Sequence, residues 1–192
     1  VGVDFSPASI EHAREQASAS GLAAEYILAD IRAYAPAPSA FDCVLLTFGE
    51  INVFTEQDAR ALLRTAFTAL KSGGLLLLEA HTEEAVRAAG SASASWYSAE
   101  SGLFSPKPHL CFEEHNWDSA SATASTRYCI VDAATSGVTF YGSTMQAYSL
   151  DRYQTMLHEA VFSGALLPSS DWPTGSVFEG KLQAFACLKS SS

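Results

Sequence analysis

Apolar residues form short continuous runs in the first half of the chain and alternate with polar residues in much of the second half. Phe41 to Leu46 and Leu75 to Glu79 are almost uninterrupted apolar stretches, which is typical of parallel strands covered on both faces. Leu110 to Trp117, Thr126 to Asp132 and Val138 to Tyr148 alternate instead, as half-buried antiparallel strands do. The pattern predicts a buried parallel sheet followed by an antiparallel meander.

Three helices are indicated by apolar spacing and by capping residues. The clearest runs from Glu56 to Leu70, capped by Thr55 and ended by Gly73-Gly74. Its apolar positions recur at spacings of three and four: Ala59, Leu62, Leu63, Ala66, Phe67 and Leu70. An earlier helix is expected from Ser6 and Pro7 to Gly21, with Ile10, Ala13 and Ala17 on its apolar side. A later one is expected from Ser149 to about Phe162.

Strands and helices alternate at the start of the chain. Strands are expected at Val1 to Asp4 and Ala24 to Ala29 around the first helix, and a last strand at Lys181 to Lys189. Alternation of this kind requires crossover connections and a parallel sheet. The predicted fold class is therefore α/β, with a doubly wound, mostly parallel sheet and an antiparallel insertion.

Composition and charge exclude several partners. The net charge is −10 and the 11 Lys and Arg residues are scattered, so the chain lacks the basic cluster that nucleic acid requires. No apolar run approaches the roughly 20 residues of a membrane helix. The four cysteines are far apart and form no zinc-type cluster. We expect reduced core cysteines, no metal, no membrane association and a cytoplasmic location.

Two aspartates follow the first two strands. Asp4 and Asp30 lie where parallel strands end, and open α/β sheets bind ligands at that edge. Asp4 can accept two hydrogen bonds from a ribose diol, and Asp30 can accept one from the amine of adenine while Ile31 covers the ring. A solvated turn for Asp4 and a helix cap for Asp30 are the alternatives.

A short polar and glycine-containing segment follows the strand predicted to be central. Gly49 allows the backbone to approach a ligand closely, and Phe48 offers a flat apolar wall. The alternative is a turn in which Gly49 only provides a positive φ and Phe48 belongs to the core.

Four segments, in this order and spacing, resemble class I S-adenosylmethionine-dependent methyltransferases of the bacterial small-molecule type. V-G-V-D-F-S-P-A-S-I-E-H-A-R-E resembles the second strand and helix of that family, and A-D-I-R its adenine-contacting turn. F-D-C-V-L-L resembles its fourth strand, and L-K-S-G-G-L-L-L-L-E the step into its fifth. The segment from Tyr148 to Phe162 is similar to a helix that precedes the final antiparallel strands in many members.

The resemblance implies methyl transfer from S-adenosylmethionine to a small-molecule acceptor. It implies that Asp4 holds the ribose hydroxyls, that Phe5 flanks the adenine, and that Asp30 and Ile31 contact the base. The complete predicted cofactor-binding set is Asp4, Phe5, Ser6, Asp30, Ile31, Thr47, Phe48 and Gly49.

One part of the family pattern is missing. Nothing in the chain matches the E/D-x-G-x-G-x-G loop that normally precedes the acid corresponding to Asp4. Its strand should lie between the strand that ends at Asp4 and the strand that starts at Phe41. We therefore expect either a fragment of a longer protein that lacks the first strand or a chain whose missing part is supplied in some other way, with two strand edges left without partners.

By this reading the chain has three parts. Residues 1–89 form a partial cofactor-binding α/β core, 90–148 an antiparallel insertion that serves as acceptor lid, and 149–192 a C-terminal helix and terminal strands that complete the core sheet.

The sequence does not identify the catalytic residues. A general base is needed only if the acceptor must lose a proton. The candidates for it are Glu50, His81, His109, Glu114 and His115. Candidates for lining the acceptor pocket are Trp96, Tyr97, Phe104, Trp117 and Tyr141, although an aromatic-rich strand is more often part of the core. Two rival functions are a nicotinamide-dependent oxidoreductase and a non-catalytic binding or assembly module. The pattern gives no oligomeric state.

Overall fold

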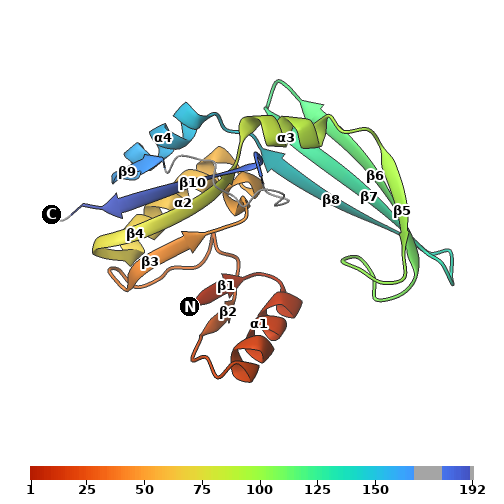
Figure 1. Ribbon diagram of the computed structural model, residues 1–192, viewed down its shortest axis with the longest axis horizontal. Coiled ribbons are helices and arrows are strands. Elements are labelled where there is room, and N and C mark those ends of the chain that lie inside the picture. The colour runs from red at the N-terminus through yellow and green to blue at the C-terminus, as the bar shows by residue number, and fades with distance from the viewer. Residues whose placement is uncertain (167–178, 191–192) are drawn as a thin grey trace.

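The computed structural model describes residues 1–166 and 179–190 and contains three sheets (Figure 1). The first is a parallel pair, β1 (Gly2–Asp4) and β2 (Tyr26–Leu28), joined by α1 (Pro7–Ala19). Ser6 caps the helix by accepting a hydrogen bond from the backbone N of Ser9, and Pro7 occupies the first turn. Figure 1 shows this unit apart from the other two sheets.

The main sheet has the strand order β3-β4-β10-β9. β3 and β4 are parallel, as predicted, and β10 is antiparallel to both of its neighbours. Apolar side chains of the helices pack against this sheet and bury Leu63, Leu76, Tyr153 and Phe185. The elements of this part are β3 (Phe41–Leu46), η1 (Glu50–Val53), α2 (Glu56–Ala69), β4 (Leu70–His81), α4 (Leu150–Glu159), β9 (Phe162–Leu166) and β10 (Leu182–Lys189).

The third sheet is the predicted antiparallel meander, which we call the lid sheet. Its order is β5-β6-β7-β8, and it extends to one side of the main sheet (Figure 1). Val86 of α3 packs on Ala124, so α3 covers part of one face. Its elements are α3 (Glu83–Gly90), β5 (Ser95–Ala99), β6 (His109–Asp118), β7 (Thr123–Asp132) and β8 (Val138–Gln146).

Several local expectations need correction. The helix α2 ends at Ala69 and not at Gly73-Gly74, because Leu70 is already extended and both glycines lie within β4. α4 ends at Glu159, and Val161, with φ 67°, turns the chain into β9. β3 is only partly buried, and Cys43 is exposed, contrary to the expected core position. The edge of β3 that faces away from β4 has no strand paired with it among the described residues.

Cys111 and Cys187 are buried as expected, and all four cysteines are free thiols. No helix among the described residues is long and apolar enough to span a membrane. The tail of the expected domain 149–192 includes residues 167–178, 191 and 192, which lie outside the described part of the chain.

Candidate cofactor and acceptor site

Asp4 lies at the carboxyl end of β1, directly before α1. Its Oδ1 accepts a hydrogen bond from the backbone N of Ser6 at 2.7 Å, which orients the carboxylate at the start of the helix. The side chain of Asp4 is exposed, and Phe5 beside it is 79% exposed. The second carboxylate oxygen has no partner in this turn. The position suits a ligand hydroxyl at the sheet edge.

Asp30 occupies the equivalent place after β2 but is engaged by a neighbour. Nε of Arg32 lies 3.0 Å from Oδ1, and Nη2 lies 2.6 Å from Oδ2. These side-chain hydrogen bonds from Arg32 lower the pKa of the Asp30 carboxyl. Ile31 packs against the core of the main sheet. The carboxylate of Asp30 is therefore ionised and fixed by Arg32.

The turn after β3 is held in an uncommon backbone conformation. Phe48 and Gly49 both have positive φ, 58° and 75°. The backbone N of Phe48 donates to Oε2 of Glu79 at 2.8 Å, and that of Gly49 to the carbonyl of Glu79 at 3.2 Å. The side chain of Phe48 is 63% exposed, so it is not the core residue that the alternative required. A strained turn braced from the neighbouring strand is typical of a ligand-binding loop.

His81, at the end of β4, lies against this turn. A Cβ built on Gly49 would lie 2.3 Å from Cδ2 of His81, so only glycine allows this approach. Burial is the main cause that lowers the pKa of His81, since it disfavours the charged ring. The imidazole is neutral near pH 7 and can accept a proton.

A buried polar network fixes the backbone of His81. Asn52 is fully buried, and its Oδ1 accepts from the backbone N of His81 at 2.9 Å. Its Nδ2 donates to the hydroxyl of Tyr153 at 2.7 Å and to the carbonyl of Gln146 at 2.8 Å. The hydroxyl of Tyr153 donates in turn to the carbonyl of His81 at 3.0 Å. The ends of β4 and β8 and the helix α4 are thus joined at one point.

The carboxylate of Glu50, in the turn after β3, interacts electrostatically with Asp4 at the end of β1. Desolvation raises the pKa of its carboxyl, and the negative charge of Asp4 raises it further. The two carboxylates therefore lie close enough to repel each other. The structure brings Asp4, the turn at residues 47–50 and His81 to the carboxyl edge of β1, β3 and β4.

The other base candidates lie on the lid sheet and have structural partners. Nδ1 of His109 lies 2.8 Å from the carbonyl of Lys107, and the side chain is buried. Glu114 pairs with Arg127 across the strands. Nδ1 of His115 lies 3.1 Å from Oγ1 of Thr126. These partners explain the residues without a catalytic role.

The aromatic residues expected to line the acceptor pocket lie in different surroundings. The ring of Phe104 stacks on Tyr141, with centroids 5.2 Å apart. Trp117 lies under the guanidinium of Arg87. Trp96 and Tyr97 are exposed on β5. The structure therefore does not bring the five aromatic residues together in one pocket.

Sequence reasoning missed the roles of Glu79 and Asn52. Glu79 ends the apolar run of β4, and an acid after four leucines is a signal for a strand-end side chain. Asn52 carries no such signal, because its partners are 29 to 101 residues away in the sequence.

Comparison with known proteins bears on the fold. The family model of a methyltransferase domain matches residues 1–74. No curated protein sequence matches the chain. An S-adenosylmethionine-dependent methyltransferase from Clostridium acetobutylicum ATCC 824 is similar in structure, with a TM-score of 0.75 and 13% identity over 98% of this chain and 74% of that one.

Two further solved structures share the fold. A sugar N-methyltransferase from Streptoalloteichus sp. ATCC 53650 has a TM-score of 0.67 and 16% identity, over 99% of this chain and 70% of that one. An amino pentose methyltransferase from Micromonospora echinaspora, solved with S-adenosylmethionine bound, has a TM-score of 0.62 and 18% identity, over 98% and 73%.

The described chain therefore has the α/β fold of S-adenosylmethionine-dependent methyltransferases, and residues 1–74 match a methyltransferase domain in sequence. The α/β fold class inferred from the sequence motifs is confirmed.

Proposed function

We propose that this chain transfers a methyl group from S-adenosylmethionine to a small-molecule acceptor. The observation that carries the proposal is the convergence of Asp4, the turn at residues 47–50 and His81 at one sheet edge. Open α/β sheets bind their ligands at this edge. The same edge serves methyl transfer well, because the enzyme mainly has to hold donor and acceptor in line.

The residues present fit the adenosine half of the cofactor. Asp4 has an exposed carboxylate for the ribose hydroxyls, and the exposed rings of Phe5 and Phe48 offer apolar surfaces for the adenine. Ser6 and Thr47 flank these residues, and Gly49 lets the backbone come close. Asp30 and Ile31 contribute the base-contacting turn, with Arg32 fixing the carboxylate. The negative charges of Asp4 and Glu50 favour a cationic sulfonium.

We further propose that one more parallel strand belongs between β1 and β3. In the part of the chain that the structure describes, β1 pairs only with β2, and β3 only with β4. A hollow of about 530 Å³ lies between them, lined by residues of both strands that include Val3 and Val44, and by Leu62 and Ala66 of α2. Unpaired backbone groups on two facing parallel edges are satisfied by a strand between them.

The acceptor is proposed to be a small molecule bound between this edge and the lid sheet. Residues 1–89 then form the cofactor-binding part, 90–148 the lid and 149–192 the part that completes the sheet. Structural neighbours that act on sugars and amino sugars support an acceptor of this size. A neutral His81 can take the proton that an ammonium or hydroxyl acceptor must lose.

Four free cysteines support a cytoplasmic location.

The experiment compares cofactor binding with and without the proposed strand. The chain is fused upstream of Val1 to the first strand, glycine-rich loop and helix of a methyltransferase of the same fold. Both proteins are titrated calorimetrically with S-adenosylhomocysteine. We expect the fusion to bind and the unfused chain to bind weakly or not at all. Equal affinity would contradict the proposed strand.

Asp4→Ala in the fusion tests the ribose contact. Loss of two hydrogen bonds to a charged group, each worth about 1.5–3 kcal/mol, should weaken binding roughly a hundred- to ten-thousandfold. Asp4→Asn should be milder because its amide oxygen still accepts one bond. Unchanged binding with a normal thermal midpoint would remove Asp4 from the site.

A further inference from the structure

The turn after β2 contains an arginine that engages the carboxylate expected to contact adenine. Oδ1 of Asp30 accepts hydrogen bonds from the backbone N of Arg32 at 2.9 Å and from its Nε at 3.0 Å. Oδ2 accepts from Nε at 3.1 Å and from Nη2 at 2.6 Å. An ionised carboxylate has about four lone-pair sites. Each oxygen of Asp30 therefore already has two contacts, and no site is left for the amine of a base.

The guanidinium of Arg32 has donors left over. In the part of the chain that the structure describes, Nη1 makes no hydrogen bond, and Oδ2 of Asp58 lies 3.9 Å from it, which is beyond hydrogen-bond range. Nη2 carries a second proton in addition to the one that Asp30 accepts. The side chain of Arg32 is 54% exposed. The turn therefore presents N–H donors to a ligand, whereas the sequence motif predicts an acceptor there.

Arg32 lies at the sheet edge that is proposed to bind the cofactor. Asp30 follows the carboxyl end of β2, and Asp58 belongs to the first turn of α2, which begins just after the turn at residues 47–50 and η1. The guanidinium thus extends from the end of β2 toward the start of α2. Ile31 packs against the core of the main sheet, which leaves Arg32 as the long exposed side chain of this turn.

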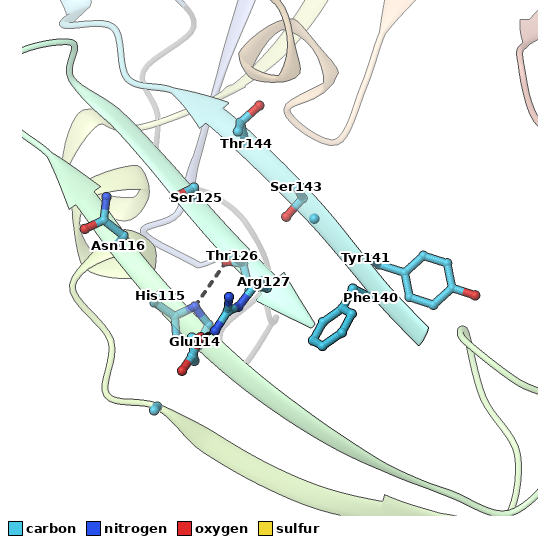
Figure 2. A pocket seen from close by; sticks show the side chains of 12 residues that line it. Glu114, His115, Asn116, Ser125, Thr126, Arg127, Phe140, Tyr141, Ser143 and Thr144 are labelled. Carbon is cyan, nitrogen blue, oxygen red and sulfur yellow. Dashed lines mark hydrogen bonds and ion pairs between the residues drawn. The ribbon is translucent and has the colours of Figure 1, made fainter. Parts of the chain in front are cut away.

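Another exposed arginine is bound in a different way. Arg127 pairs with Glu114 on the lid sheet (Figure 2), and in that pair Nη2 alone donates to one carboxylate oxygen. Its side chain is 66% exposed, similar to that of Arg32. The guanidinium of Arg32 is instead held at two of its nitrogens, so its plane is fixed before a ligand arrives. Donors that are fixed in advance lose little conformational entropy on binding.

We propose that Arg32, and not Asp30, contacts the adenine of the cofactor, by donating from its guanidinium to a ring nitrogen beside the exocyclic amine. This contact rests on the proposed function, the binding of S-adenosylmethionine at the same edge. The ring nitrogens of adenine accept hydrogen bonds and suit a guanidinium, whereas the amine is a donor and does not. Asp30 is then a positioning residue that holds the guanidinium in place.

The pair between Arg32 and Asp30 persists when the base binds. A base that covers the turn excludes water, and the attraction between opposite charges rises as the local dielectric constant falls. If the neutral amine displaced Arg32, one neutral donor would replace a charge-assisted, two-pronged contact. The carboxylate therefore stays with Arg32.

Calorimetric titration of the fusion that supplies the additional strand tests the proposal. The two probes are S-adenosylhomocysteine and its 6-deamino analogue, in which hydrogen replaces the amine and the ring nitrogens remain. For the fusion without further substitution we expect dissociation constants that agree within about threefold. A loss of about tenfold or more for the deamino analogue would show that the site reads the amine, and would overturn the proposal. This comparison requires no variant, so it is decisive whatever the stability of Arg32→Ala.

Arg32→Ala tests the contact itself. It should weaken binding of the deamino analogue at least about tenfold, because a charge-assisted hydrogen bond is lost. It should also create a preference of about tenfold for the probe with the amine, because Asp30 is then free to accept from it. Arg127→Ala removes an equally charged and similarly exposed side chain and should leave both affinities unchanged. Unchanged affinities in Arg32→Ala would overturn the proposal. If no variant binds either probe, the proposed cofactor site fails, and the contact with it.

The fixed guanidinium is tested on the full chain without a ligand. The proton on Nε of Arg32 should exchange with water more slowly than that of Arg127, as measured by nuclear magnetic resonance, because only the former is hydrogen-bonded among the described residues. Asp30→Ala should remove the difference. Equal exchange of the two protons in the wild-type chain would overturn the proposal.

Discussion

Asn52 is the residue on which most of the site geometry depends. It is fully buried, and its side-chain amide binds the backbone of His81, the backbone of Gln146 and the hydroxyl of Tyr153. A buried donor or acceptor that loses its partner costs about 1–3 kcal/mol, more than a typical hydrogen bond contributes. Asn52 therefore acts on both the strand end and the lid sheet.

Replacing Asn52 by Ala should lower the free energy of unfolding by about 2–4 kcal/mol, since several buried groups lose a partner together. Tyr153→Phe should cost less, about 1–2 kcal/mol, because only the hydroxyl is removed. Urea denaturation measures both. Asn116→Ala, at an exposed position on the lid sheet, should change stability by less than about 0.5 kcal/mol. A similar loss for Asn52→Ala and Asn116→Ala would mean that the network contributes little.

The lowered pKa of His81 predicts a dependence of stability on pH. Burial keeps the folded-state pKa below the ordinary value of about 6.5, so the unfolded chain takes up the proton first as the pH falls. The contribution of the neutral ring is complete above about pH 6.5 and is lost as the pH falls through the folded-state pKa. His81→Gln should remove this part of the slope. The check is the free energy of unfolding of both proteins against pH; parallel curves would exclude a shifted pKa at His81.

At the scale of elements, the main sheet combines a covered strand and a bare one. Leu76 in β4 is fully buried between β3 and β10, whereas Leu45 in β3 is 59% exposed beside the unpaired edge. The two leucines have the same chemistry and differ in their surroundings. The two leucines lie on opposite faces of the sheet, because Leu76 pairs with Val44 and Leu45 pairs with Leu77, and β3 also lies at the end of its sheet.

Leu76→Ala should therefore cost about 2–5 kcal/mol, through lost burial and the cavity that remains. Leu45→Ala should cost less than about 1 kcal/mol in the unfused chain. In the fusion that supplies the additional strand, we expect the cost of Leu45→Ala to rise, because the added strand covers the same region. Thermal and urea unfolding of the four proteins measure this; an unchanged cost in the fusion would argue that the strand does not enter the hollow.

The sequence pattern is sufficient for the parallel strands, the meander and three of the helices, because continuous apolar runs and alternation are local signals. It was not sufficient for α3 and β5, where short Ala- and Ser-rich segments have no marked period. Of the predicted site, Asp4 and the turn at residues 47–49 lie at one edge. The contacts of Asn52 and Glu79 come from other strands, which no local pattern encodes.

For the whole molecule, the unit of β1, α1 and β2 is the least supported part. It packs mainly on itself, with Ile10 and Ala17 as its buried residues, while the main core gathers residues from β3, β4, α2, α4, β9 and β10. A parallel pair of three-residue strands has little stability of its own. Local opening should therefore occur there first.

Hydrogen exchange followed by mass spectrometry should show this difference. Amides of residues 2–28 should exchange much faster than those of β4 and β10, which lie in the interior of the main sheet. In the fusion, β1 should become protected because it gains a partner on its open edge. Equal protection of β1 and β4 in the unfused chain would show that the N-terminal unit is held by contacts other than those described.

The contact between Gly49 and His81 also provides an internal spectroscopic reporter. The α-protons of Gly49 lie against the imidazole ring, so the ring current displaces their nuclear magnetic resonance signals from the usual position for glycine. Any ligand that shifts the turn after β3, or any change in the charge of the ring, alters that displacement. The resonances of this one glycine therefore report occupancy of the sheet edge directly, without a label and before any acceptor is known.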